Sequence, residues 1–367
     1  MVNTNSNIFE PLTLQATVDA MEPNKGLMLL NSTKQESEEN FTFSWDMKFG
    51  GGTSVAEFNT PNAKANMVDR TGAKSNTQIA TMAYMREADY FNYTNTNWLK
   101  DPTSINDPGV KLRGEQKVAD QIRHMADRLD NRIEKSLWAA IQGSLNYTGK
   151  NTGPLNVDYK FKSSHKPTLG STELWDAVLA DTAAVDFKKL IDNIRGFKKL
   201  IEIDGGVEVK EVFATGKTID LLMDVWQRAV LNGLPDRYIT DSQIAEYLST
   251  GTISGGFMGI NTWTRVDQNL SIEQPDGSIV VESYLPHGTV VLANRTENSA
   301  LSLYNGPSAD WDSGGKIGRF TKSWVDPDPS GRAFLIEQSF LPVIKAPDQF
   351  VVAKVASDTW RDAQDWR

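Results

Sequence analysis

The sequence predicts an α+β protein built around one long helix. Apolar residues recur at steps of three and four through residues 110–145, which is the spacing of a helix with one buried face. Two strand-like runs precede this stretch, and most other strand-like runs lie beyond residue 250. Because helices gather early and strands late, the pattern favours an α+β fold over a doubly wound parallel sheet.

Composition indicates a globular chain that relies on packing and on contacts between chains. Its 367 residues are 39% hydrophobic and 23% charged, which is enough to bury a sizeable core. The absence of cysteine excludes thiol catalysis, disulfides and zinc–thiolate sites. A net charge of -9 argues against tight, sequence-independent nucleic-acid binding, which needs clustered Lys and Arg. The sequence shows neither a signal-peptide layout nor an apolar run as long as a membrane span.

Residues 1–40 form a polar and acidic segment that we expect to be an N-terminal arm. The segment contains one short candidate helix, from Leu12 to Met21. It holds too few apolar residues to fold alone, and chain ends are normally ordered only where something fixes them. We therefore expect a neighbouring subunit to hold this arm.

Residues 41–92 are predicted to form a hairpin with an unusually long connection. Its two strand-like runs, Phe41–Phe49 and Thr77–Phe91, alternate and carry aromatic residues. The segment between them begins with three glycines and has too few apolar side chains to bury a core of its own. Loops longer than about 15 residues are usually functional or disordered. We expect this hairpin to contact neighbouring subunits through Lys48, Phe58, Lys64, Met67 and Arg70.

The long helix has one apolar stripe and no proline from Gly109 onward. At about 1.5 Å per residue it would span about 50 Å, well beyond the usual three or four turns. A coiled-coil seam is the alternative, but the stripe lasts too few heptads and includes Ala and Ser. The stripe consists of Val118, Ile122, Met125, Leu129, Ile133, Leu137 and Ile141. The residues expected to face solvent are Glu115, Arg123, Asp127, Arg132 and Glu134.

The second half of the chain alternates at first and then becomes rich in strands. Residues 148–184 show no clear pattern. Helices are predicted from Asp186, over Gly216–Leu231 and near Ser242–Leu248, with a strand at Lys210–Thr215. The later strand-like runs cover residues 256–266, 278–285, 288–295, 299–306, 317–325, 332–344 and 348–355.

The run ATGKT, residues 214–218, resembles the end of a phosphate-binding loop because it follows a predicted strand and precedes a predicted helix. The first glycine of the motif G-x-x-x-x-G-K-[ST] is missing, since Glu211 holds its place. The strand also runs directly into Gly216, which leaves no room for backbone amides to surround a phosphate. We therefore interpret the run as a strand-to-helix turn rather than a nucleotide site.

A second motif has the spacing of a calcium-binding loop. Prolines 327 and 329 stand between the would-be ligands, and the flanking runs look like strands, whereas an EF-hand needs helices. We interpret the motif as a Pro-containing turn between strands. The residues at the ligand spacing are Asp326, Asp328, Ser330, Gly331 and Glu337.

The three histidines, His124, His165 and His287, are scattered along the sequence. His124 lies on the long helix among polar neighbours, where we expect it to face solvent. Catalytic groups meet only in the fold, and nothing in the sequence selects a set of them. The sequence therefore assigns no catalytic, cofactor-binding or metal-binding residue.

The C-terminal third carries motifs that resemble a known family. Residues 284–295 read YLPHGTVVLANR, and residues 323–355 read SWVDPDPSGRAFLIEQSFLPVIKAPDQFVVAKV. Together they resemble the closing segment of the lambda-like major capsid protein E family of tailed phages, with its P-x-x-x-x-V-L-x-N strand and its L-P-x-x-x-x-P-D-x-F-V end. The fold-motif residues are Trp324, Pro329, Gly331, Arg332, Pro342, Pro347 and Asp348.

The resemblance implies a Hong-Kong-97-type capsid fold and a structural subunit without enzymatic activity or cofactor. Such a subunit assembles as hexamers and pentamers into an icosahedral head that encloses double-stranded DNA, in the virion. A separate scaffolding protein or protease, a portal and a decoration protein are the expected partners, and no membrane is expected. The alternatives are the shell protein of a cellular nanocompartment and, outside the fold, a calcium- or nucleotide-binding enzyme.

The resemblance also implies a division of the chain. The expected parts are 1–40, N-terminal arm; 41–92, extended hairpin loop; 93–185, spine helix and peripheral domain; 186–315, axial domain; 316–356, closing strands of the peripheral domain; and 357–367, C-terminal tail.

Overall fold

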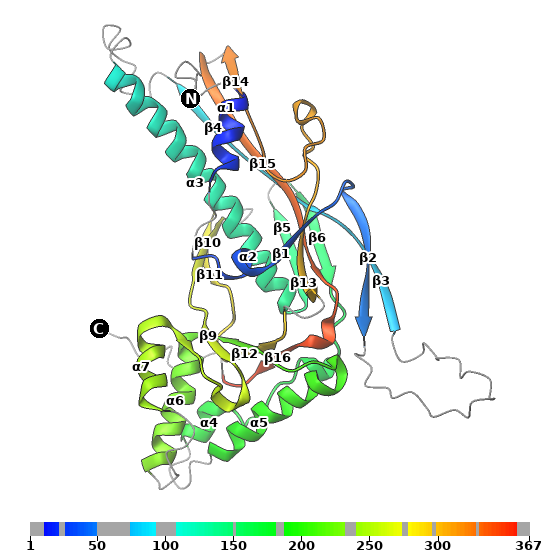
Figure 1. Ribbon diagram of the computed structural model, residues 1–367, viewed down its shortest axis with the longest axis vertical. Helices are drawn as coiled ribbons and strands as arrows, with labels where there is room; N and C mark the ends of the chain where they lie inside the picture. Colours follow the sequence, from blue (N-terminus) through cyan, green and yellow to red (C-terminus); the bar gives the residue numbers. More distant parts are fainter. Residues whose placement is uncertain are drawn as a thin grey trace, which may run out of the picture. The chain divides into compact units, whose positions relative to one another are not determined.

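The computed structural model describes residues 11–21, 26–49, 74–92, 108–149, 152–180, 187–231, 240–273, 278–295, 299–327 and 330–357 (Figure 1). Contacts divide the chain into two compact units, each made of three separate stretches. The first unit comprises Met1–Ser44, Ile79–Leu137 and Ser302–Val343. The second comprises Trp45–Gln78, Trp138–Leu301 and Ile344–Arg367.

The predicted long helix is confirmed as α3, Pro108–Ile141. Proline suits the first turn of a helix because its missing N–H would have no partner there. All seven stripe residues are buried. In the first unit the stripe packs against α1, Pro11–Asp19, and against Phe334 and Ile336 of the neighbouring sheet. The short helix near the N-terminus was thus also predicted correctly, and α3 supplies the apolar surface that covers it.

One residue on the expected solvent face of α3 is buried instead. Glu134 accepts hydrogen bonds from the backbone amides of Leu29 at 2.9 Å and Leu30 at 2.7 Å. These amides belong to α2, Met28–Ser32. The carboxylate satisfies amides at a helix start, where the helix dipole favours negative charge. The solvent-facing assignment of Glu134 was therefore wrong, because its partners come from a distant part of the chain.

The first unit contains a five-stranded sheet centred on β15, Ser330–Ile344. The strands β14, Phe320–Pro327, and β4, Ala83–Asn92, are both antiparallel to β15. The order continues from β15 to β13, Leu301–Asn305, which pairs in parallel with β1, Lys34–Ser37. Because side chains alternate along a strand, β15 turns Phe334 and Ile336 toward α3 and Glu337 toward the opposite face.

The hairpin before α3 is present, but its second run is broken. The strand β2, Thr42–Phe49, pairs with β3, Lys74–Thr81, in a two-stranded ribbon. Thr77 Oγ1 donates to Asp46 Oδ1 at 2.7 Å across this ribbon. The expected run Thr77–Phe91 is divided at Met82, whose amide bonds to Phe41 O at 2.8 Å, so that β4 joins the sheet of β15 instead.

The second unit is built on a sheet of order β16-β12-β7-β9-β8. Only the β7–β9 pair among these neighbours is parallel. The inner strand β12, between β16 and β7, is buried along its whole length, as a strand covered on both faces must be. The strands are β7, Glu211–Ala214; β8, Thr252–Ile253; β9, Thr262–Arg265; β12, Thr289–Ala293; and β16, Phe350–Lys354.

Four helices accompany this sheet and share its apolar core. The helix α6, Gly216–Leu231, begins and ends where the sequence predicted. The helix α7, Asp241–Thr250, begins with a capping box at Thr240 and Gln243, which satisfies its first amides. The other two helices are α4, Trp175–Ala180, and α5, Phe187–Leu200. A π-helical turn, η4, Ile201–Gly205, extends α5.

Two further ribbons lie in the second unit. They are β5–β6, Ser144–Gly149 with Thr152–Asp158, and β10–β11, Asn269–Glu273 with Ile279–Ser283. The short turn η3, Ser163–His165, follows β6. No sequence pattern predicted β6 or η3, and β10 was not predicted either.

The strands of residues 316–356 lie in both compact units. β14 and all of β15 except Ile344 belong to the first unit, whereas β16 pairs with β12 in the second. Between them Pro347 begins the 3-10 turn η8, Pro347–Gln349, and its fixed φ suits the change of direction.

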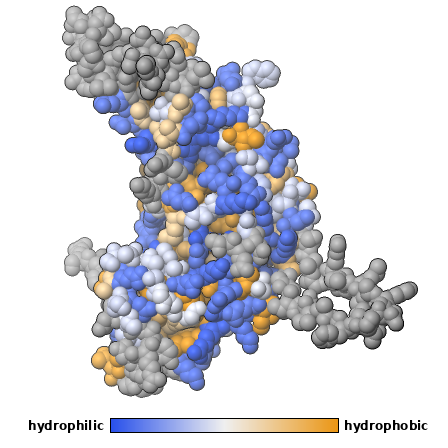
Figure 2. All heavy atoms as spheres, in the orientation of Figure 1, coloured by the Kyte–Doolittle hydropathy of each residue, from blue (hydrophilic) through white to orange (hydrophobic). Residues whose placement is uncertain are grey.

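Hydrophilic residues cover much of the face in Figure 2, with hydrophobic residues interspersed. None of the helices in the described ranges has the length and apolar character of a membrane span.

Candidate functional site

Residues 50–73 connect the two strands of the β2–β3 ribbon. Hydrogen bonds from β2 attach this ribbon to the segment that follows β15 within the second unit. Trp45 Nε1 donates to Ile344 O at 3.2 Å, and Lys48 N donates to Lys345 O at 2.7 Å. The alternate residues of β2 that are buried are Phe43, Trp45 and Met47. The side chain of Lys48, which follows Met47, is exposed. One face of β2 therefore anchors the ribbon, and the other is available to solvent.

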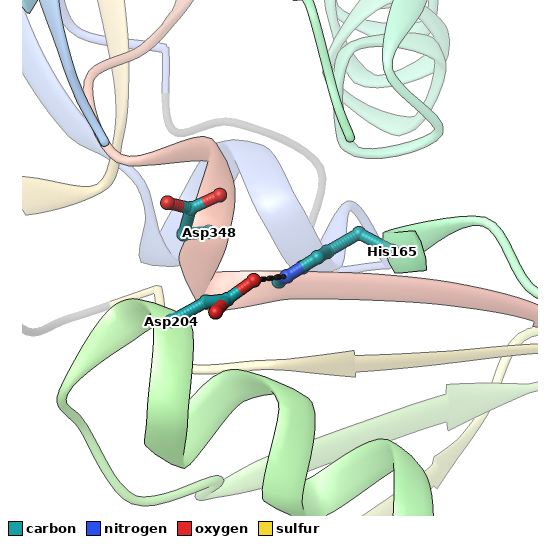
Figure 3. Close-up of side chains that lie close together, drawn as sticks. All are labelled: His165, Asp204 and Asp348. Atoms are coloured by element: carbon teal, nitrogen blue, oxygen red, sulfur yellow. Dashed lines mark hydrogen bonds and ion pairs between the residues drawn. The ribbon is translucent and has the colours of Figure 1, made fainter. Parts of the chain in front are cut away.

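A polar cluster in the second unit brings together three segments that are distant in sequence (Figure 3). His165 of η3, Asp204 of η4 and Asp348 of η8 place ligand-type atoms within 4.8 Å of one another. His165 Nε2 lies 3.0 Å from Asp204 Oδ2, and its Nδ1 lies 2.7 Å from Phe350 O. Lys162 Nζ donates to Asp204 Oδ2 at 3.1 Å and to Asp348 Oδ2 at 3.0 Å. We call these four residues the Lys162 cluster.

Burial and charge pairing act in opposite directions on the Lys162 cluster. Burial raises the pKa of the Asp204 carboxyl, but hydrogen bonds from His165 and Lys162 outweigh it and hold the pKa below its ordinary value. Burial lowers the pKa of Lys162, and its bonds to Asp348 and Asp204 more than restore it. His165 and Asp348 are 0% and 2% exposed. A buried charge persists only when it is paired, and Asp348 has the Lys162 ammonium beside it, while both ring nitrogens of His165 have polar partners.

A buried carboxylate in the first unit, Glu337, holds the loop between β13 and β14. One oxygen accepts hydrogen bonds from the Ser308 hydroxyl and from Asp310 N, the latter at 3.1 Å, and the other accepts from the Tyr84 hydroxyl. Arg86 Nε lies 3.5 Å from the carboxylate. Burial and the bond to Glu337 raise the pKa of Tyr84 well above its ordinary range, so the hydroxyl remains a donor.

The arrangement around Glu337 excludes the calcium-loop interpretation. On the β14–β15 hairpin, Asp326 pairs with Gly331, whereas Glu337 pairs with Phe320. Glu337 lies six positions after Gly331 along β15, which is a distance of about 20 Å. A single ion cannot reach both ends, so the motif is a turn between strands, as predicted.

The ATGKT run is also a turn, and its first amide is already occupied. Gly216 N donates to Asp267 Oδ1 at 2.5 Å, and the Thr218 hydroxyl accepts from Gly288 N at 3.2 Å. A carboxylate therefore takes the place that a phosphate would need at the start of α6. A Cβ at position 216 would meet the ends of the Asp267 and Arg265 side chains, which would have to move to make room for it.

A family model described as phage major capsid protein E matches residues 12–355, almost the whole chain. The chain belongs to the phage major capsid protein E family. It is a structural, non-enzymatic protein that self-assembles into the icosahedral head shell, and it is a component of the virion. The resemblance seen in the sequence is thereby confirmed. No curated protein matches this capsid protein.

Solved structures show that the capsid protein has the Hong-Kong-97-type fold. A prophage protein of E. coli CFT073, described as its capsid protein, is similar with a TM-score of 0.60 and 14% identity, over 94% of this chain and 99% of that chain. A phage-related protein of Bordetella bronchiseptica RB50 has a TM-score of 0.52 and 10% identity, over 96% and 99% of the two chains. The predicted α+β capsid fold is therefore confirmed.

The fold-motif residues of the capsid protein lie in both units. Trp324 is 39% exposed on β14, and Lys322 Nζ lies 6.0 Å from its ring. Pro342 is buried in β15, and Pro347 begins η8. Asp348, named only as a motif residue, is also part of the Lys162 cluster.

Two fold-motif residues, Gly331 and Arg332, lie in a strand. β15 begins at Ser330, so the structure places Gly331 and Arg332 inside the strand, where they pair with Asp326 and Val325. Of the residues expected to contact neighbours, only Lys48 is described. Those that lie outside the described residues are Phe58, Lys64, Met67 and Arg70, together with the motif residue Pro329.

No sequence pattern pointed to the Lys162 cluster. His165 and Asp204 are separated by 39 residues, and Lys162 and Asp348 by 186 residues. Only the fold brings η3, η4 and η8 together, so no spacing rule could have found the group.

Proposed function

We propose that the β2–β3 ribbon and the connection of residues 50–73 clasp a neighbouring subunit of the head shell. The observation that supports this role is that β2 has one buried face, which holds Trp45 and Met47, and one exposed face that a neighbour could contact. Ile79 of β3 is 69% exposed although it is a large aliphatic side chain. Such a residue gains about 2 kcal/mol when it is fully buried, and a neighbouring subunit would provide that burial.

Within this proposal the parts of the chain keep the roles that the resemblance implied. Residues 1–40 act as an arm, 41–92 as the extended loop, 93–185 with 316–356 as the peripheral domain, 186–315 as the axial domain and 357–367 as a tail. Subunits associate as hexamers and pentamers. A separate scaffolding protein or protease guides assembly, and a portal and a decoration protein complete the head.

Replacement of Gly51–Ala73 by a short Gly-Ser turn tests the clasp. We expect a soluble subunit whose circular dichroism and melting stay close to the parent's, because α3 and both sheets keep their cores. Closed shells should be absent in negative-stain micrographs, since every subunit loses the contact and many interfaces of about 1,000 Å² or more act together in a shell.

The control for this experiment is the parent chain carrying the same Gly-Ser turn after its C-terminus. It should assemble normally. Closed shells of normal size from the shortened chain would contradict the clasp. Failure of the shortened chain to fold would also contradict it, since residues 51–73 would then belong to the subunit's own core.

A further inference from the structure

The hydrogen bonds of His165 leave two acceptors facing each other. A backbone carbonyl can only accept, so Nδ1, 2.7 Å from Phe350 O, carries a hydrogen and donates it. In a neutral ring Nε2 then carries a lone pair, yet it lies 3.0 Å from the carboxylate atom Asp204 Oδ2. Two acceptors approach this closely only when a hydrogen or a metal ion lies between them.

One divalent ion would balance the two carboxylates of the Lys162 cluster. Asp204 and Asp348 together carry two negative charges. The ammonium of Lys162 lies between these carboxylates, with Nζ 3.1 Å from Asp204 Oδ2 and 3.0 Å from Asp348 Oδ2. A divalent cation would bring two positive charges to the same place.

We propose that the Lys162 cluster is a binding site for a divalent transition-metal ion of the Zn²⁺ type. The ligands are His165 Nε2 and one carboxylate oxygen each from Asp204 and Asp348, whose atoms lie within 4.8 Å of one another (Figure 3). Imidazole with carboxylates suits Zn²⁺, whereas Ca²⁺ and Mg²⁺ prefer oxygen ligands alone. The bond from Nδ1 to Phe350 O fixes the ring with Nε2 toward the ion, as carbonyls commonly do for metal-binding histidines.

The surroundings allow the ion to enter. The side chain of Lys162 is 40% exposed, so its ammonium can move into solvent when an ion takes its place. The side chain of Asp204 is 29% exposed and lies at the open side of the cluster, whereas Asp348 is buried. Three protein ligands leave one position of a tetrahedral ion for water.

The backbone around the cluster supports a close approach of its segments. A Cβ at Gly205 would lie 2.8 Å from Asp348 O, so only glycine lets η4 approach η8 this closely. η4 is a π-helical turn. This form is rare in proteins, and where it occurs it is often part of a functional site. An ion at this place would join η3, η4 and η8, and it would stabilise the folded subunit because the unfolded chain lacks the site.

Zinc titration of the purified full-length subunit tests the site, with calorimetry for affinity and thermal melting for stability. ZnCl₂ should raise the melting temperature, and CaCl₂ should leave it unchanged. Lys162→Met removes the competing ammonium, so this variant should bind Zn²⁺ about tenfold more tightly and regain on zinc addition the stability lost without it. Asp348→Asn should bind at least about tenfold more weakly than the parent, because even the loss of a group that only orients a ligand costs about this much.

His287→Gln is the matched control, because a histidine outside the cluster could bind zinc adventitiously. This variant should behave as the parent does. Zinc stabilisation that is equal in the parent and in Asp348→Asn would overturn the proposal. So would the absence of zinc binding by folded Lys162→Met, since the cluster would then be closed by a proton and lysine alone.

Discussion

Glu337 accepts a hydrogen bond from the backbone amide of Asp310 at 3.1 Å, and this contact ties the β13–β14 loop to the middle of β15. Glu337 is completely buried, and the Ser308 and Tyr84 hydroxyls also donate to it. A residue whose spacing suggested a calcium ligand is therefore the internal anchor of a loop. The loop presents Trp311, which is 95% exposed, on a support fixed by this carboxylate.

Glu337→Gln should destabilise the subunit by about 1–3 kcal/mol, because one of the two hydroxyl donors would face an amide donor in a buried site. Urea unfolding of the unassembled subunit measures this difference. Glu173→Gln, at an exposed position, is the control and should lie within about 0.5 kcal/mol of the parent. Equal stability of the two variants would show that Glu337 does not anchor the loop.

Acid should weaken the same region through Asp310. Burial raises the pKa of its carboxyl, but hydrogen bonds from Lys322 and from the Asp312 amide outweigh it and hold the pKa below the ordinary 3.8. A carboxyl with a depressed folded pKa contributes stability above its unfolded pKa and loses it as the pH falls through the folded pKa. Asp310→Asn should thus be less stable than the parent at neutral pH, and the difference should shrink below about pH 4. A difference that stays constant in urea unfolding across this range would contradict the assignment.

Gly288→Ala should destabilise the second unit, whereas Gly170→Ala should not. Gly288 has φ +70, and a Cβ there would lie 2.3 Å from Ala356 O. A left-handed conformation alone costs a non-glycine residue about 1–2 kcal/mol, and the backbone clash adds to this. Nothing lies within 4 Å of a Cβ at Gly170. Thermal melting of the two variants checks the contrast, and equal melting temperatures would count against the role given to Gly288.

Periodic elements could be predicted from the sequence, because their signal is local. The 3.6-residue period of α3 and α6 and the apolar runs of β12 and β15 each depend on neighbours within one element. Glu134 could not be placed, since the amides that bury it lie 105 and 104 residues away. The contact between His165 and Asp204 could not be predicted for the same reason, since 39 positions separate them in the sequence. The ribbon β5–β6 was missed because Asn, Thr and Gly obscure its alternation.

The capsid protein should form shells without covalent links between subunits. Lys48 is an exposed lysine at the ribbon, but the lambda-like resemblance implies shells held by non-covalent contacts. Shells boiled in detergent should release one band near the chain mass of 40.7 kDa in gel electrophoresis. Unboiled shells that stay at the top of the gel serve as the control for assembly. A ladder of heavier bands after boiling would contradict this expectation.

The clasp is tested most directly by asking whose residues Lys48 touches in an assembled shell. Unlabelled subunits are mixed with heavy-isotope subunits before assembly, the shells are treated with a lysine-reactive cross-linker, and peptides that contain Lys48 are identified by mass spectrometry. Because the ribbon is proposed to contact a neighbour, Lys48 should be joined to peptides of the other isotope label as well as its own. If every cross-link from Lys48 joins peptides of the same label, the ribbon lies on its own subunit and is not a clasp.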